Sequence, residues 1–163
     1  MAVALTINGT TYQYPVPGQD PTWGADATDW AKAVTAALAT LISPGDILQT
    51  QFTINNNISV ATNINGLIFD SGTVRAANIE YTIYRISTAN PTGQTESGRI
   101  HLTFDDSATV GQKWVLSQFS NGTNSGVVFS IDDSTGQVQY TSSDINSIGY
   151  VGTITFTAKV LNK

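Results

Sequence analysis

The spacing of apolar residues from residue 46 onwards most constrains what this chain can fold into. Apolar side chains alternate with polar ones in short runs, most clearly at 79–83, 100–104 and 154–160. Alternation with a period of two is typical of strands that bury one face. Clusters of Asn, Asp, Gly and Pro separate these runs and favour turns. Strands are therefore expected at 47–54, 58–62, 66–70, 77–87, 98–105, 113–120, 126–131, 137–141 and 150–161.

Eight or nine short strands with regular turns predict an antiparallel β-sandwich or jelly-roll-like domain over residues 46–163. The composition agrees with a mainly β fold. Hydrophobic residues make up 40% of the 163, enough for a packed core, but only 12% are charged. That charged share is about half the usual one. The surface is therefore expected to owe its polarity to the hydroxyl and amide groups of Thr, Ser, Asn and Gln.

A different period precedes this domain. Between residues 27 and 42, apolar side chains recur three and four positions apart, which predicts a short helix with an a/d face. This face consists of Ala27, Trp30, Val34, Ala37 and Leu41. Two interpretations stay open: the helix packs on its own β-domain, or it joins helices of other chains in a short parallel bundle.

The segment before the helix combines a hairpin pattern with a proline-rich stretch. Residues 3–16 alternate around Asn8-Gly9, the dipeptide that favours a type I′ hairpin turn. A lone two-stranded hairpin is only marginally stable in water, so this one is expected to need a partner. Three prolines then lead to Trp23. The expected organisation is an anchoring arm at 1–25, a helical neck at 26–45 and the β-domain at 46–163.

Charge and composition argue against several partners. The net charge is −5 and the pI about 4.4, which disfavours binding to nucleic acid or to anionic lipid. No apolar run approaches the roughly 20 residues of a membrane helix, and the N-terminus lacks the pattern of a signal peptide. We therefore expect neither a nucleic-acid nor a membrane partner.

The residues that usually carry catalysis are scarce. The chain has no cysteine and one histidine, His101, which lies in the outward phase of its strand. Transition-metal sites and Ser-His-Asp triads are therefore not expected. The adjacent pairs Asp105-Asp106 and Asp132-Asp133 fall at strand ends, where carboxylates accept turn hydrogen bonds. A calcium site in these loops is the alternative. We expect no cofactor, no metal and no enzymatic activity.

Two parts of the sequence resemble one class of protein. The layout "LTINGTTYQYPVPGQDPTWGADATDWAKAVTAAL" resembles the N-terminal segments of tailed-bacteriophage virion proteins. Downstream, "RAANIEYTIYRIS", "ESGRIHLTF", "KWVLSQF", "GVVFSI" and "GQVQYTSS" look like the small β-domain shared by phage tail-fibre and head-appendage proteins.

The resemblance implies a homotrimeric virion protein that is made in the cytoplasm of the host bacterium. The short chain favours a capsid decoration (cement) or head-fibre protein. The alternative is a short tail fibre or a tail-associated protein that binds a host receptor or carbohydrate. Its expected partners are a phage capsid or tail protein and, as a further candidate, a host-surface glycan.

This interpretation assigns roles to two sets of residues. The trimer interface is expected at Trp30, Val34, Ala37 and Leu41. Contact with the virion is expected through Leu5, Ile7, Tyr12, Tyr14 and Trp23.

Overall fold

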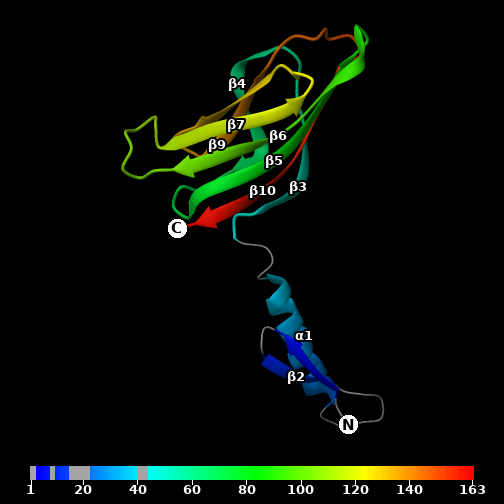
Figure 1. Ribbon diagram of the computed structural model, residues 1–163, viewed down its shortest axis with the longest axis vertical. Coiled ribbons are helices and arrows are strands. Elements are labelled where there is room, and N and C mark those ends of the chain that lie inside the picture. Colours follow the sequence, from blue (N-terminus) through cyan, green and yellow to red (C-terminus); the bar gives the residue numbers. More distant parts are fainter. Residues whose placement is uncertain (1–2, 8–9, 15–22, 40–43) are drawn as a thin grey trace. The chain divides into compact units, whose positions relative to one another are not determined.

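The computed structural model describes residues 3–7, 10–14, 23–39 and 44–163. The chain divides into two compact units, Met1–Ser43 and Pro44–Lys163 (Figure 1). The first holds a hairpin and the one helix of the described ranges, and the second holds all the remaining strands.

The N-terminal unit pairs strand β1 (Val3–Ile7) with strand β2 (Thr10–Tyr14) in antiparallel register. Ile7 lies opposite Thr10, so two residues connect the strands, as the Asn-Gly signal predicts. Helix α1 (Trp23–Ala39) contacts both strands. It begins four residues before the expected start at residue 27, so Trp23 belongs to the helix and not to an extended arm.

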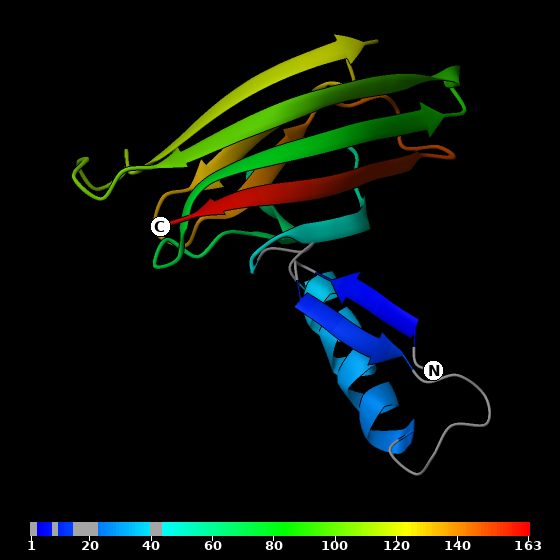
Figure 2. The same cartoon turned by 60° about the horizontal axis from the view of Figure 1, so that its bottom comes forward.

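The C-terminal unit is a sandwich of two antiparallel sheets, which confirms the predicted mainly β fold class. One sheet has the strand order β3-β10-β5-β6-β7 and the other the order β4-β9-β8. Figures 1 and 2 show the smaller sheet covering one face of the larger one. The strands are β3 (Ile47–Thr53), β4 (Ile58–Ile68), β5 (Val74–Ser87), β6 (Asn90–Phe104), β7 (Trp114–Gly122), β8 (Val127–Asp132), β9 (Gln137–Ser142) and β10 (Val151–Asn162).

The core lies between the two sheets and follows the predicted alternation. Inward positions of the central strands are buried, while their sequence neighbours are exposed. Burial of these apolar side chains away from water is the main force that holds the sheets together. The buried set includes Ile79, Tyr81, Ile83, Ile100, Leu102, Phe104, Ile154, Phe156, Ala158 and Val160.

Two expected boundaries differ from the structure. The strands expected at 58–62 and 66–70 form the single strand β4, which passes through Gly66 at a φ of 86° with two shifts in register. Residues 90–93, which fall between the strands expected at 77–87 and 98–105, lie inside β6, because the chain already reverses between Ser87 and Asn90. There the backbone N–H of Asn90 donates to the Ser87 hydroxyl at 3.2 Å, which stabilises the tighter turn.

Candidate functional site

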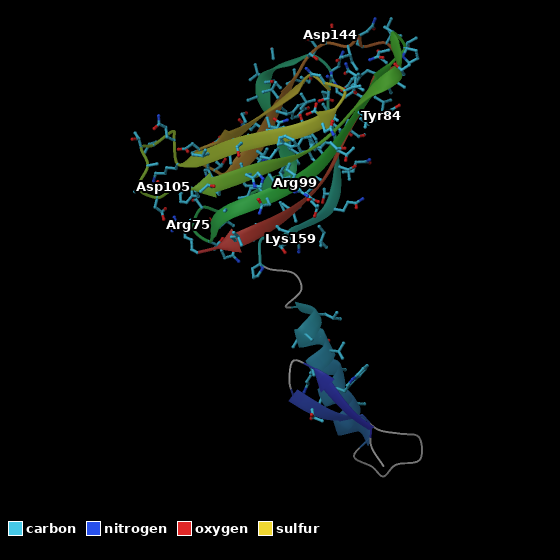
Figure 3. All side chains as sticks on the ribbon, in the orientation of Figure 1. Arg75, Tyr84, Arg99, Asp105, Asp144 and Lys159 are labelled. Carbon is cyan, nitrogen blue, oxygen red and sulfur yellow. The ribbon has the colours of Figure 1, made fainter. Side chains whose placement is uncertain are left out.

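A shallow groove of about 690 Å³ crosses the open face of the five-stranded sheet. All five strands contribute to it, because every second residue of each strand points away from the core. Figure 3 shows Arg99 on this face, between Arg75 at one end of the sheet and Tyr84 toward the other. The lining consists of Gln49, Glu80, Tyr81, Thr82, Ser97, Gly98, Arg99, Phe119, Thr155, Phe156 and Thr157.

The register brings the charged and polar groups of the groove side by side. Glu80 lies opposite Arg99, and the Nη2 atom of Arg99 is 2.9 Å from the Oε1 atom of Glu80. On the next row, the hydroxyls of Thr82 and Ser97 are 3.2 Å apart. Both partners of the ion pair are more than half exposed, so the pair adds little to stability. Its hydrogen-bonding groups therefore remain accessible to a ligand.

An aromatic ring borders the groove. Phe119 on β7 lies opposite Arg99, and 75% of its surface is exposed. Next to it, Gly98 leaves room on the inner side of the sheet for the buried Tyr81, since a Cβ at this position would come within 2.7 Å of the Tyr81 hydroxyl. The groove thus combines hydroxyl, amide, guanidinium and carboxylate groups with one apolar ring, all held on rigid strands.

A buried carboxylate lies below this face. Glu96 is 5% exposed; its Oε1 accepts a hydrogen bond from the Tyr81 hydroxyl at 3.0 Å. Its Oε2 accepts from the N–H and the hydroxyl of Ser125, at 2.9 and 2.7 Å. Gln118 donates to the Tyr81 hydroxyl at 2.7 Å. Each carboxylate oxygen therefore has donors within the protein, which fits a structural role that ties β5, β6 and β7 to the segment before β8.

The surroundings of Glu96 shift two pKa values. Burial acts to raise the pKa of Glu96, but hydrogen bonds from Ser125, with help from Ser120 and Tyr81, outweigh it and leave this pKa below its ordinary value. Burial, followed by the charge of Glu96, raises the pKa of Tyr81 to about 12. Both shifts keep Glu96 ionised and Tyr81 protonated near neutral pH.

Glu96 should therefore stabilise the fold in a pH-dependent way. A carboxyl whose pKa is lower in the folded state stabilises above its unfolded value, ordinarily 4.5, and loses that contribution as the pH falls through the folded pKa. We expect Glu96→Gln to lower the free energy of unfolding by about 1–3 kcal/mol at pH 7, since an amide has one acceptor oxygen where both oxygens of the carboxylate accept hydrogen bonds. The difference from the wild type should shrink below about pH 4.5, as urea unfolding at several pH values would reveal. A difference independent of pH would contradict this role.

One aspartate of each adjacent pair accepts turn hydrogen bonds as expected, whereas Asp106 pairs with Lys163 and Arg75. The side chain and then the backbone of Ser107 hold the pKa of Asp105 below its ordinary value, and Ser134 does the same for Asp132. Asp133 accepts hydrogen bonds from the backbone N–H of Gly111 and Trp114. Within the described ranges, no group of three or more His, Cys, Asp or Glu side chains is placed to hold a metal.

The expected trimer residues lie on the half-buried side of α1. Trp30, Val34 and Ala37 are half-buried, whereas most of the other helix positions are exposed. Within the N-terminal unit, the helix contacts the hairpin of its own chain. Leu41 lies outside the described residues, as do the side chains of Leu5, Ile7, Tyr12, Tyr14 and Trp23. In the ranges described, no helix has both the length and the apolar character of a membrane span.

The sequence pattern does not predict the groove. Tyr81 and Tyr84 fall on opposite faces of β5, which argues against a row of exposed aromatics on that strand. The relevant ring is Phe119, on a different strand. Its signal in the sequence is an apolar residue in the same phase as Ser117 and Asn121, and Val115 at the start of the strand shares that outward phase.

Comparisons with known proteins give distant structural neighbours only. No protein-family model matches the chain, and no curated protein matches it significantly. The tailspike protein of Acinetobacter phage vB_ApiP_P1 is similar at 16% identity and a TM-score of 0.41, over 70% of this chain and 22% of that one. The tailspike protein of Acinetobacter baumannii phage AM24 is similar at 10% identity and a TM-score of 0.33, over 72% of this chain and 26% of that one.

This chain thus spans about a quarter of the length of these two tailspike chains. Both neighbours are phage tail proteins, the class that the resemblance leaves open as its alternative. TM-scores this low do not establish a shared fold.

Proposed function

We propose that this chain is a non-enzymatic phage virion protein, associated with the tail, that binds a host-surface carbohydrate through the groove of its β-sandwich. The N-terminal unit attaches it to the particle. The groove carries this proposal, because a capsid decoration protein needs only its contact with the capsid. A polar groove on the outer face of the sandwich is an added feature that binding to a host would require.

The chemistry of the groove suits a saccharide. Neighbouring sugar hydroxyls both donate and accept hydrogen bonds, and the Arg99–Glu80 pair offers guanidinium donors and carboxylate acceptors side by side. The exposed ring of Phe119 can cover the C–H face of a sugar. Gln49 and Thr155 add amide and hydroxyl groups at the β3 side. Only a few such polar groups are needed to fix the orientation of a ligand.

The same residues support the proposal of binding without cleavage. Glycoside hydrolysis generally needs two carboxyl groups that flank the scissile bond. The groove lining contains one, Glu80, and it is paired with Arg99. The buried Glu96 has hydrogen-bond donors on both oxygens.

The N-terminal unit supplies attachment and assembly in this proposal. A two-stranded hairpin has little stability of its own, so docking on a virion protein would stabilise it. We assign the contact with the virion protein to Leu5, Ile7, Tyr12, Tyr14 and Trp23. We assign the interface of a homotrimer to the helix face formed by Trp30, Val34, Ala37 and Leu41.

The test is binding of the full-length protein to an array of bacterial surface glycans, with isothermal titration for any that bind. We expect Arg99→Ala and Phe119→Ala each to weaken binding by about tenfold or more, since each removes a direct contact. His101→Ala is the matched control. It changes an exposed residue on the same strand, outside the groove lining, and should bind as the wild type does. Loss of binding in the control alone, or no effect of either groove variant, would contradict the proposed site.

A further inference from the structure

The edge strands of the sandwich differ in composition from its central strands. The edges are β3 and β7 in the larger sheet and β4 and β8 in the smaller one. Together they contain a single charged residue, Asp132, and no proline. Central strand β5 alone carries Arg75, Glu80 and Arg85. Natural proteins usually place charges or proline on exposed edges, because an unprotected edge pairs with other chains.

Exposed apolar side chains gather on these same edges. Central strands β5, β6 and β9 expose one large apolar side chain, Tyr84, and β10 exposes two, near its ends. The four edge strands expose six: Leu48, Val60, Ile68, Val115, Phe119 and Val128. Apolar residues in this number along uncharged edges mark surfaces that pack against another protein.

Among the described strands, β7 has no neighbouring strand on the side away from β6. Two backbone hydrogen bonds at the ends of the β6–β7 pairing, from Asp105 N to Lys113 O and from Thr123 N to Thr95 O, are both 2.9 Å long and join odd-numbered residues. In an antiparallel pair, hydrogen-bonded residue pairs alternate with pairs that are not hydrogen-bonded. Because the register between the strands is unbroken, the odd-numbered residues of β7 therefore hydrogen-bond to β6. The N–H groups of the even-numbered residues point to the open edge. Of these, Trp114 donates to Asp133 and Gly122 to the Asn121 side chain.

The even-numbered residues between those two ends are Leu116, Gln118 and Ser120. Within the described part of the chain, their N–H groups have no hydrogen-bond partner. By contrast, the pairing of β3 with β10 and of β4 with β9 contains register shifts, and β8 is short with Asp132 at its end. Strand β7 is therefore the edge best suited to extend the sheet.

We infer that the sandwich packs edge to edge with further copies of this chain, with the β7–β8 edge of one copy against the β3–β4 edge of the next. Strand β3 contacts β4 and β7 contacts β8, so the two edges lie at opposite ends of the strand order. Apart from Asp132 at the end of β8, both are uncharged, and both expose apolar side chains, so each suits the other. A chain of net charge −5 repels its own copies elsewhere, and these edges, with one charge between them, are where copies can approach.

A contact between two different edges is heterologous, and it closes into a ring when the rotation between copies permits. The inference thus rests on the proposed trimer and gives it an interface in the β-domain. The groove runs from Gln49 on β3 to Phe119 on β7, so its two ends lie on these edges. Pairing of β7 with β3 of the next copy would place the grooves of neighbouring copies end to end.

Charge substitutions on the edges test the contact in the full-length protein. We expect Val115→Lys and Leu48→Lys each to raise the concentration at which the oligomer dissociates by about tenfold or more, since each buries a charge in an apolar contact. Thr103→Lys is the matched control: Thr103 is exposed and lies directly opposite Val115 on the central strand β6. It should dissociate as the wild type does. Sedimentation velocity over a concentration series gives the mass in multiples of 17.3 kDa, and circular dichroism verifies folding.

Cross-linking identifies which edges meet. The chain has no cysteine, so Leu48→Cys with Val115→Cys introduces the only thiols. A short bismaleimide should then link copies into covalent trimers, whereas Leu48→Cys with Thr103→Cys should give far fewer. Dimers from Val115→Cys alone would place β7 against β7 and overturn the inference. An oligomer that withstands both edge lysines but dissociates with Val34→Asp would also overturn the inference. That result would still agree with the proposed trimer through the helix and with the proposed groove.

Discussion

Replacing Arg85 with Met is expected to lower the free energy of unfolding by about 3 kcal/mol or more. The side chain is fully buried, at 0% exposure. Its Nη2 donates to Asn56 Oδ1 at 2.9 Å and to the Ser143 carbonyl at 2.6 Å, and its Nε donates to the Tyr150 hydroxyl at 3.1 Å. Its Nη1 donates to the Ser125 carbonyl.

These acceptors come from three separate connections between strands, and a methionine side chain has no donor for any of them. Buried acceptors without donors lose their hydration and regain nothing, which is the physical origin of the large effect. Ser125 also donates to Glu96, so the loss should extend to that carboxylate. Urea unfolding of the full-length protein at pH 7 gives the free energy.

Arg75→Met is the matched control for this measurement. Arg75 lies on the same strand, but its side chain is 48% exposed and its nearest carboxylate, on Asp106, is 3.9 Å away. A surface pair of this kind contributes about 0–1 kcal/mol, so its loss should be small. Similar effects of the two substitutions would show that the buried network adds no more than a surface contact.

Removing residues 1–43 is expected to abolish incorporation of the protein into phage particles while the β-sandwich stays folded. The division of the chain at Ser43 and Pro44 separates the proposed attachment unit from the groove. Among the residues that the structure describes, the core cluster comes from the second unit, so we expect the sandwich to keep its hydrophobic stabilisation without the first. Immunoblots of purified particles, made with the truncated protein as the only copy, measure incorporation.

Trp23→Ala in the full chain is the finer version of this experiment. If Trp23 is an anchor, its loss should cost about 2–4 kcal/mol of binding per subunit. Three subunits would compound that loss through avidity. Truncated protein that still joins the particle would show that the sandwich attaches and would reverse the roles proposed for the two units.

The sequence alone determined the mainly β fold class, the approximate strands and the core. Alternation at 79–83, 100–104 and 154–160 is a local pattern, and burial of one strand face follows from it directly. The same pattern determined that His101 is exposed. Arg85 shares the inward phase of the expected strand 77–87, whereas Glu96 precedes the expected strand 98–105, and charged residues are rarely buried without partners. Their partners, such as Asn56, Ser125 and Ser143, lie far from them in the sequence.

Only the tertiary structure decided the groove and the edges. Gln49, Glu80, Arg99, Phe119 and Thr155 come from five strands, and only the order β3-β10-β5-β6-β7 makes them neighbours. Strand order depends on long-range pairing, which the period of an individual strand does not encode. The same holds for β7: its lack of charge is visible in the sequence, but this becomes meaningful only because β7 has a partner on one side and none on the other.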